Sequence, residues 1–248
     1  MVLKVPDTIA QTHASFCPGC GHGIIVRLMA EAVEEAGLSE KTIVVVDVAC
    51  GSLMLEQWNF DTVQAAHGRP IVTAAGVKHV RRDCAVFAHI GDGAAYAIGM
   101  AETMHAALRN DNVIAIVVNN CVFGMTGGQM SPTTLLGQKT ITAPKGRDYA
   151  KSGQPFDVVK ALGGFDIAYL ARASVDSPAA IRTAGKYVKK ALKKHMDGQG
   201  FCLIEFLSPC PTNWKMSPAD SMAWIREKVI PSYATGEFVD KEAGSHDN

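Results

Sequence analysis

The sequence predicts an α/β protein with a doubly wound, mostly parallel sheet. Short runs of β-branched and apolar residues recur along the chain, and segments with helical spacing of apolar residues separate them. Unbroken apolar runs of this kind are typical of strands that helices cover on both faces. Because crossovers between parallel strands are right-handed, we expect one open sheet with a helix layer on each side.

Composition indicates a single packed domain over residues 1–248. Hydrophobic residues make up 48% of the chain, and 24 basic residues balance 24 acidic ones. The zero net charge gives no indication of a nucleic acid or an anionic membrane as the main partner. No apolar run approaches the roughly 20 residues of a membrane span, and the first residues lack the layout of a signal peptide. We therefore expect a cytoplasmic protein with its seven cysteines as thiols.

In the N-terminal half, the first sixteen residues show no clear pattern. Apolar residues at helical spacing begin at Gly23 and predict a helix that ends near Gly37. The β-branched run 42–48 predicts a buried strand. The segments that follow are predicted as a helix packed closely on the sheet, a strand and an alanine-rich helix: 71–78, 85–90 and 94–108.

In the C-terminal half, the apolar run 113–118 predicts another buried strand. Residues 121–148 are rich in Gly, Thr, Ser and Pro without periodicity, and a loop of that length is usually functional. A helix at 178–195 is expected to be capped by Asp176 or Ser177 and to end at Gly198. The remaining expected elements are a helix, two strands and a loose polar end: 156–162, 165–170, 201–206 and 235–248.

Chemically distinctive residues follow the ends of four predicted strands. Cys50, the Gly91-Asp92-Gly93 turn, the Asn119-Asn120 pair and Cys210 each come just after an apolar run. The carboxyl ends of parallel strands meet at one edge of a sheet, where ligands bind in open α/β folds. We therefore expect these four segments to line one crevice.

The turn around Asp92 and the asparagine pair have the donors of a magnesium-diphosphate site. Asp92 supplies a carboxylate oxygen, Asn120 an amide oxygen and Val122 a backbone carbonyl, which are the hard ligands that Mg²⁺ prefers. The glycines let a diphosphate approach the backbone at a helix start. Two plain turns with a capping Asp are the structural alternative. A nucleotide is the runner-up ligand, although the chain has neither a GxxxxGKS/T loop nor a complete GxGxxG motif.

Four cysteines suit a metal centre at the same edge. Cys17 and Cys20 form a CxxC motif around proline and glycine, and Cys50 and Cys210 supply two more thiols. The motif precedes the first strand, which disfavours a thioredoxin-like dithiol. Four thiolates fit tetrahedral zinc or an iron–sulfur cluster, and the isolation of Cys50 and Cys210 favours the cluster. The other cysteines are predicted to be packed thiols: Cys84, Cys121 and Cys202.

Taken together, these motifs resemble the β subunits of 2-oxoacid:ferredoxin oxidoreductases, of the type that acts on 2-oxoisovalerate or 2-oxoglutarate. The resemblance covers nearly the whole chain and implies the thiamine-diphosphate-binding fold. The stretches that carry it are FCPGCGHG at Phe16–Gly23, HGR at His67–Arg69, GDG with AIG at Gly91–Gly99, NNCVFGMTGGQMSPTT at Asn119–Thr134 and LSPCPTNW at Leu207–Trp214.

The resemblance implies three cofactors: thiamine diphosphate, Mg²⁺ and a 4Fe–4S cluster. Magnesium is assigned to Asp92, Asn120 and Val122. The cluster ligands carried over by position are Cys17, Cys20, Cys50 and Cys210. The residues placed against the thiamine cofactor are Val48, Ala49, Cys50, Gly51, His67, Gly91, Asp92, Gly93, Ala94, Asn120, Val122, Gly124, Met125 and Thr126.

The activity implied is the oxidative decarboxylation of a 2-oxoacid with coenzyme A to acyl-CoA and CO2, with electrons leaving through the cluster. The partners implied are an α subunit and ferredoxin, with small γ and δ ferredoxin-like subunits as further candidates. A carboxylate on the aminopyrimidine ring is expected from the partner chain. Glu56 and Glu102 qualify by residue type alone, and the 121–148 loop is expected to face the partner.

Two departures from the family pattern affect the site. Ala94 replaces an acidic residue that many relatives carry after GDG, and the neutral 51–53 segment replaces a basic one after Cys50. The second departure leaves the contact to the oxoacid carboxylate unassigned. His22 is expected to support the site, while Lys139, Lys145 and Arg147 are expected to form a solvated loop face.

Two other function classes fit the same residues. One is a non-redox thiamine-dependent lyase with structural zinc on the four cysteines. The other is an electron-transfer or metal-binding module that has lost catalysis. Branched-chain 2-oxoacids and 2-oxoglutarate are the leading substrates, and the sequence does not choose between them.

Overall fold

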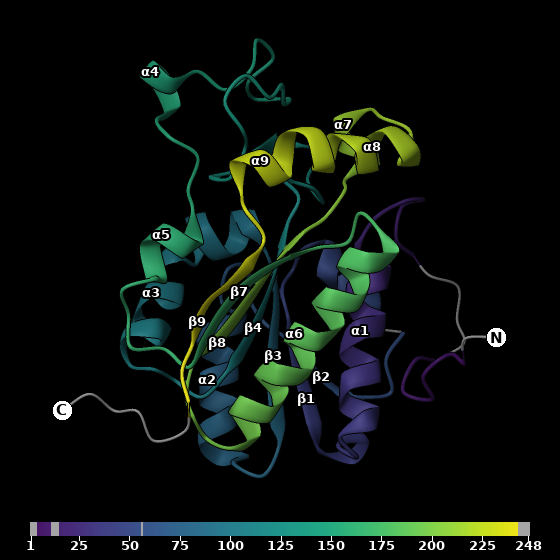
Figure 1. Cartoon of the computed structure of the whole chain (residues 1–248), viewed down its shortest axis with the longest axis vertical. Helices are drawn as coiled ribbons and strands as arrows, with labels where there is room; N and C mark the ends of the chain where they lie inside the picture. Colours follow the sequence, from purple (N-terminus) through teal and green to yellow (C-terminus); the bar gives the residue numbers. More distant parts are fainter. Residues whose placement is uncertain (1–3, 11–14, 56, 243–248) are drawn as a thin grey trace.

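The computed structural model describes residues 4–10, 15–55 and 57–242, which form a sheet covered by helices on both faces (Figure 1). Within these residues the large sheet has seven strands in the order β2-β1-β3-β4-β8-β7-β9. All neighbours are parallel except β9, which runs antiparallel to β7. The predicted doubly wound α/β fold is therefore confirmed. The strands are β1 Thr42–Val46, β2 Asp61–Gln64, β3 Ala85–Gly91, β4 Ile114–Asn119, β7 Tyr169–Ser174, β8 Cys202–Leu207 and β9 Gly236–Asp240.

The strand side chains divide the core into two layers. Val44 of β1 and Phe87 of β3 pack with α1 and α6, while Val45 and Val86 point to the opposite face and pack with α2, α3 and α5 (Figure 1). This alternation with a period of two explains why the central strands are apolar throughout. The covering helices are α1 His22–Glu35, α2 Pro70–Val80, α3 Met100–Leu108, α5 Val158–Leu162 and α6 Pro178–Met196. Of the two caps predicted for α6, Ser177 accepts the hydrogen bond from Ala180 N.

The single helix predicted at 94–108 is wrong. Residues Ala94–Ile98 form a π-helical turn, and α3 begins only at Met100. The junction residue, Gly99, lies so close to the 67–69 turn that a Cβ atom there would be 2.1 Å from the backbone oxygen of Gly68. A tertiary contact therefore divides a segment whose composition favours one helix.

Two further predictions are wrong near the C-terminal end. The strand predicted at 165–170 is β7 at Tyr169–Ser174, because Phe165 and Ile167 pack into the core before the strand begins. The polar segment at 235–248 was expected to be loose, but Gly236–Asp240 forms β9, while residues 243–248 lie outside the described part of the chain. Its acidic residues are paired across the edge: the Tyr169 hydroxyl donates to Glu237 at 2.9 Å, and Lys190 lies 2.8 Å from Asp240.

The 121–148 loop and the helices after Cys210 lie at one end of the sheet, at the top of Figure 1. The loop contains a short hairpin, β5 Val122–Phe123 with β6 Gln129–Met130, and leads to α4 Tyr149–Ser152. The later helices, which the sequence did not predict, are α7 Pro211–Trp214, α8 Pro218–Trp224, the π-helical turn Ile225–Val229 and α9 Ile230–Ser232.

Arg147 anchors this loop, which corrects the expectation of a solvated loop face at that position. Only 7% of Arg147 is exposed, and its guanidinium donates to six backbone carbonyls. The acceptors belong to the segments 131–134 and 152–154. A rigid planar donor with several N–H groups suits this task better than a lysine.

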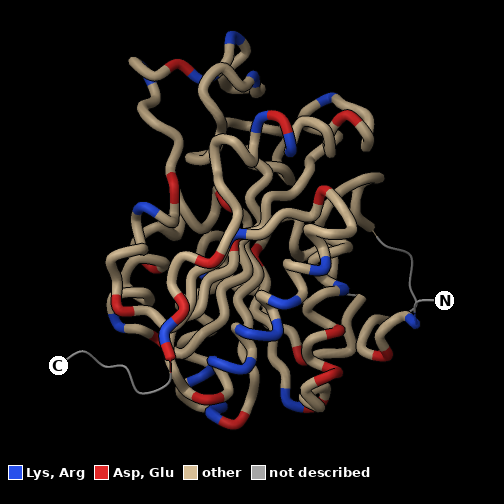
Figure 2. Tube along the Cα trace, viewed as in Figure 1, with Lys and Arg blue, Asp and Glu red and all other residues tan. Residues whose placement is uncertain are grey.

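Charged residues of both signs are intermixed along the chain (Figure 2). No helix in the part of the chain that the structure describes is long and apolar enough to cross a membrane.

We predict that Arg147→Met lowers the free energy of unfolding by about 2–4 kcal/mol, because several buried carbonyls lose a charged donor at once. Urea unfolding followed by circular dichroism measures this change. Lys145→Met, at an exposed position of the same loop, is the matched control and should change stability by less than about 0.5 kcal/mol. Equal effects of the two substitutions would contradict an anchoring role for Arg147.

Candidate active site

The four predicted segments meet at one edge of the sheet. Strands β1, β3, β4 and β8 are consecutive and parallel, so their carboxyl ends lie side by side. The register pairs Gly91 with Val118 and Asn119 with Leu207. The structure thus brings together the Asp92 turn, the asparagine pair and the two isolated cysteines, as predicted.

Asp92 is a buried carboxylate held by two hydroxyl groups. It follows β3, is 1% exposed, and its Oδ2 accepts hydrogen bonds from Ser131 Oγ at 2.8 Å and from Thr133 Oγ1. Burial raises the pKa of Asp92 to about 7, while the bonds from Thr133 and Ser131 lower it. A buried carboxylate with one oxygen fixed in this way is suited to bind a cation. Sequence reasoning did not select the two hydroxyls, because about 40 residues separate them from Asp92.

Position 93, directly after Asp92, must be glycine because the Phe123 ring packs against its backbone. A Cβ atom at Gly93 would lie 2.4 Å from the Phe123 ring. The ring therefore packs directly on the backbone of the turn, and the buried Ala94 continues from it into the π-helical turn. This contact joins the turn to the start of the 121–148 loop.

A network of hydrogen bonds fixes the turn after β4. Cys121 has a left-handed backbone with φ of 59°, and its N–H donates to Asn119 Oδ1 at 3.1 Å. Asn120 Oδ1 accepts from Val122 N at 3.3 Å, and Trp214 Nε1 donates to Asn120 O at 3.0 Å. The orientation of Asn120 and Val122 is thus set by neighbours on two sides.

The same turn rests on a buried ion pair. Asn119 Nδ2 donates to Glu205 Oε1 at 3.1 Å, and the other Glu205 oxygen accepts from Arg172 Nε. Arg172 also lies 2.6 Å from Asp157. Both members of the central pair are at most 2% exposed, so each needs the other.

The remaining residues predicted to contact the cofactor are less enclosed. Gly124 O accepts from Asn213 Nδ2 at 2.9 Å. Met125 is 47% exposed, and the Thr126 hydroxyl donates to Gln129 Oε1 within the loop. On the β1 side, Val48 is exposed, whereas Gly51 packs so closely on His89 that a Cβ atom there would lie 2.7 Å from the ring.

Two of the four predicted cluster ligands, Cys50 and Cys210, border the same contact between Gly124 and Asn213. A Cβ atom at Gly124 would be 3.3 Å from Cys50 Sγ, and Asn213, which donates to Gly124, is 3.3 Å from Cys210 Sγ. The CxxC turn packs on the segment that precedes Cys210, since a Cβ atom at Gly21 would lie 2.4 Å from Ser208 Oγ.

The pKa values of Cys20 and Cys50 show that these thiols interact with the other two. Burial raises the pKa of Cys20 to about 12 and that of Cys50 to about 11, and charge on the neighbouring thiols Cys210 and Cys17 raises both further. Thiols in such surroundings stay protonated unless a cation compensates their charge. In the described segments, no group of three or more His, Cys, Asp or Glu side chains is placed to hold a metal ion. Cys84, Cys121 and Cys202 are buried, as predicted.

Three histidines lie at this edge. His22 Nδ1 is 3.3 Å from Cys20 Sγ, and the His22 ring centroid is 5.5 Å from that of His89. Burial lowers the pKa of His22 to about 4 and that of His89 to about 3, so both are neutral near pH 7. His67 differs, because its Nδ1 lies 2.9 Å from the fully buried Asp47. Sequence reasoning missed Asp47, which is hidden inside a β-branched run.

The structure does not support either of the two glutamates considered as the carboxylate that activates the aminopyrimidine ring. Glu102 lies on α3 and is 3.2 Å from Arg69 Nη1, so its charge is already paired. Glu56 lies outside the described residues.

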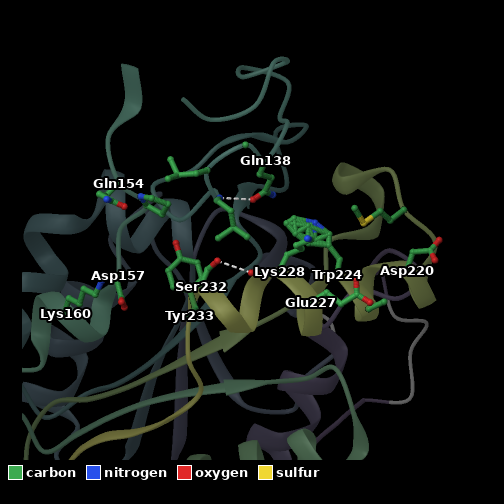
Figure 3. A pocket seen from close by; sticks show the side chains of 16 residues that line it. Gln138, Gln154, Asp157, Lys160, Asp220, Trp224, Glu227, Lys228, Ser232 and Tyr233 are labelled. Carbon is green, nitrogen blue, oxygen red and sulfur yellow. Dashed lines mark hydrogen bonds between the residues drawn. The ribbon is translucent and has the colours of Figure 1, made fainter. Parts of the chain in front are cut away.

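A cavity of about 990 Å³ lies between the 121–148 loop and the α8–α9 region (Figure 3). Gln138 contributes from the loop above it, and Trp224 and Tyr233 from the helical side below. None of the residues predicted to bind a cofactor lines it. Tyr233 donates to Thr133 O at 2.7 Å, so the cavity lies behind the hydroxyls that hold Asp92.

Comparison with known families supports a thiamine site. The family described as thiamine pyrophosphate enzyme, C-terminal TPP binding domain, matches residues 45–206. The fold is similar to that of 2-oxoglutarate:ferredoxin oxidoreductase from Magnetococcus marinus, with a TM-score of 0.77 and 24% identity over 98% of this chain and 86% of that one. This likeness shows that the two chains share a fold.

Known proteins of similar sequence identify the family more closely than the domain match does. Ketoisovalerate oxidoreductase subunit VorA of Methanothermobacter thermautotrophicus is 35% identical over 98% of this chain and 53% of its own length. 2-Oxoglutarate synthase subunit KorB of Archaeoglobus fulgidus is 34% identical over 86% of this chain and 75% of its own. The 2-oxoacid:ferredoxin oxidoreductase β subunit of Saccharolobus solfataricus is 32% identical over 79% and 62%.

The chain spans about half the length of the VorA relatives that it matches. The similarity nevertheless covers the strand-end segments from which the site is built. The chain therefore belongs to the thiamine-pyrophosphate-binding β subunits of the 2-oxoacid:ferredoxin oxidoreductase family.

Proposed function

We propose that this chain is the β subunit of an enzyme that oxidatively decarboxylates a 2-oxoacid with coenzyme A to acyl-CoA and CO2. Electrons leave through a 4Fe–4S cluster to ferredoxin. The observation that supports the proposal most is that Cys50 and Cys210 follow strands adjacent to those that carry Asp92 and Asn120, and that the thiols of Cys17 and Cys20 interact electrostatically with them. Bound thiamine diphosphate would supply the electron sink for decarboxylation, and a redox centre beside it would supply an exit for electrons.

Magnesium fits the oxygen donors at the β3 and β4 ends. Asp92 supplies a carboxylate oxygen that Ser131 and Thr133 leave free, Asn120 supplies its side-chain oxygen, and Val122 supplies its backbone carbonyl. All three are hard ligands, and diphosphate oxygens complete such a coordination shell. The rigid hydrogen bonds around them favour the narrow geometry that Mg²⁺ requires.

The thiamine diphosphate then lies across the same edge. Gly91, Gly93 and Ala94 would offer backbone groups of the turn to its phosphates. Gly124, Met125 and Thr126 approach from the loop, and Val48, Ala49, Cys50 and Gly51 from the end of β1. These segments belong to β1, β3 and β4, which are adjacent in the sheet.

The cluster is assigned to Cys17, Cys20, Cys50 and Cys210. Cys17 is exposed and the other three are partly buried; the four thiols come from three segments, and burial, together with the charges of Cys210 and Cys17, raises the pKa values of Cys20 and Cys50. Asn213 Nδ2 and His22 Nδ1 lie 3.3 Å from two of the sulfur atoms, where N–H donors stabilise thiolate charge.

The partner proposed for this chain is the α subunit. The loop and its continuation expose large apolar side chains, which mark interaction surfaces when they gather on one element. They are Met125, Leu136, Ile141 and Tyr149. Because Arg69 already neutralises Glu102, we assign the carboxylate that activates the aminopyrimidine ring to the partner. Ferredoxin and small ferredoxin-like subunits complete the proposed assembly, which we place in the cytoplasm.

A direct test of the cluster uses the anaerobically purified complex. We expect brown protein with about four irons per β subunit and visible absorbance that bleaches on reduction. Cys210→Ser should lose most of this iron. Cys84→Ser should keep it, because Cys84 is a buried thiol that precedes β3 and so lies at the opposite edge of the sheet. Colourless protein with stoichiometric zinc would instead favour the non-redox lyase.

A second prediction concerns magnesium. Asp92→Asn should weaken Mg²⁺-dependent binding of thiamine diphosphate at least about ten-fold, because a neutral amide replaces the only charged ligand assigned to the ion. Isothermal titration of the complex measures this affinity. Asp83→Asn changes an exposed carboxylate before β3 and should leave the affinity unchanged. Retained affinity in Asp92→Asn would remove Asp92 from the metal site.

A screen of substrates tests the activity as a whole. The complete complex, coenzyme A and a viologen dye are mixed with branched-chain 2-oxoacids, 2-oxoglutarate, pyruvate and aryl 2-oxoacids. We expect one class to reduce the dye with a kcat/KM at least about ten-fold above the others. If no 2-oxoacid reduces the dye, the proposed activity fails.

A further inference from the structure

A buried arginine of β7 holds three segments together. Arg172 is 2% exposed, and its Nε donates to Glu205, with which it is paired in the β7–β8 register. Its Nη2 lies 2.6 Å from Asp157 Oδ1 at the start of α5, and its Nη1 donates to Ala234 O at 3.3 Å. The Tyr233 ring packs against the guanidinium, with 5.1 Å from Cζ to the ring centroid. The guanidinium therefore fixes β8, the start of α5 and the segment after α9 relative to one another.

One route of contacts leads from this arginine to the turn that carries Asn120. Glu205 Oε1 accepts from Asn119 Nδ2 at 3.1 Å, and Asn119 Oδ1 accepts from Cys121 N at 3.1 Å. The left-handed backbone of Cys121, with φ of 59°, is unfavourable for a residue that has a side chain. Glu205 thus holds the amide that fixes Cys121 between Asn120 and Val122, the two residues assigned to the metal in this turn.

A second route leads to Asp92. The Tyr233 hydroxyl donates to Thr133 O at 2.7 Å, and Thr133 Oγ1 donates to Asp92 Oδ2. The next residue, Thr134, donates from Oγ1 to Cys121 O at 2.7 Å, so the segment that holds Asp92 also contacts the turn after β4. Both turns assigned to magnesium are therefore connected to the same guanidinium.

Stability alone does not explain a buried ion pair at this place. Arg172 and Glu205 are each at most 2% exposed, and an ion pair removed from water adds little stability compared with apolar residues of the same volume. Its hydrogen bonds are directional, however, and they restrict where the connected turns can lie. Mg²⁺ requires ligands at about 2.1 Å in a near-octahedral arrangement, whereas Ca²⁺ accepts longer and more variable distances. The relative position of the two turns therefore matters more for Mg²⁺ than for Ca²⁺.

We propose that Arg172 is a positioning residue for the magnesium site, which sets the relative position of the Asn120 and Asp92 turns through Glu205 on one side and Tyr233 on the other. Arg172 itself is assigned no contact with the ion or the cofactor. The inference rests on the proposed function, because it assumes that Mg²⁺ and thiamine diphosphate bind between these turns.

Two conservative substitutions each weaken one route. Tyr233→Phe removes the hydroxyl that donates to Thr133 O and keeps the ring beside the guanidinium. Glu205→Gln keeps an oxygen for Asn119 but removes the charge that pairs with Arg172. Binding of thiamine diphosphate to the complete anaerobic complex is measured by isothermal titration, first with Mg²⁺ and then with Ca²⁺. In each variant we expect the Kd with Mg²⁺ to rise about five-fold or more and the Kd with Ca²⁺ to change less than about two-fold, so that the preference for Mg²⁺ falls.

Matched controls come from the other end of β7. Tyr169, the first residue of the strand, donates its hydroxyl to Glu237 at 2.9 Å, away from the edge that carries the site. Tyr169→Phe and Glu237→Gln therefore make the same chemical changes elsewhere in the sheet. Both should leave the two Kd values within about two-fold of the wild type, whatever their effect on the melting temperature of the complex. An equal fall in Mg²⁺ preference in these controls would show a general loosening of the sheet and would overturn the inference.

Arg172→Lys tests whether the two routes share one origin. Lysine keeps the charge but lacks the planar set of donors, so it cannot hold Glu205, Asp157 and the 233–234 segment at once. This variant should lower the Mg²⁺ preference at least as much as either single substitution. On its background, Glu205→Gln and Tyr233→Phe should each change the Kd with Mg²⁺ by less than about two-fold, because the shared residue is already lost. Full effects on this background would show that the routes act independently of Arg172.

Two further results would overturn the inference even if Arg172→Lys fails to assemble. One is an unchanged Kd with Mg²⁺ in Tyr233→Phe or Glu205→Gln, and the other is an equal rise in the Kd values with Mg²⁺ and Ca²⁺, which would indicate a general structural role. A wild-type complex that binds no thiamine diphosphate with Mg²⁺ would refute the proposed function itself. The two failures are therefore distinguishable.

Discussion

The parallel register of β1, β3, β4 and β8 is the constraint on which the site depends. Each strand is buried on both faces, so most of its interior positions are apolar, with His89 and Glu205 as buried polar exceptions in β3 and β8. Because the strands are adjacent and point the same way, their polar ends gather at one edge. The segments after Val46, Gly91, Asn119 and Leu207 thereby meet although they lie far apart in sequence.

Buried polar groups at this edge are held in place by partners from distant segments. Asp92 is fixed by Ser131 and Thr133, Asn119 by Glu205, and the loop itself by Arg147. A buried polar group without a partner is costly, so each such contact also restricts where the backbone can lie. The long loop is consequently ordered enough to present Asn120 and Val122 in a fixed orientation, which a rigid metal site requires.

The sequence was sufficient to predict the fold and the strand-end residues, because both depend on local patterns. The runs at 42–48, 85–90 and 113–118 coincide with β1, β3 and β4 to within two residues. What it could not predict depends on distant partners. Asp47 contacts His67, and Ser131 donates a hydrogen bond to Asp92. Arg147 donates to backbone carbonyls that come together only when the loop folds. The same holds for β9, whose polar residues are paired by β7 and α6.

The two departures from the family pattern have a physical explanation in this chain. Ala94 is 2% exposed and two residues from Asp92, so an acidic side chain at that position would place a second buried negative charge beside the first. Gly51 lies against His89 and could not carry any side chain without displacing the ring. A basic side chain at position 51 is therefore incompatible with the position of the His89 ring, and a contact to an anion at this edge has to be made by a residue other than 51.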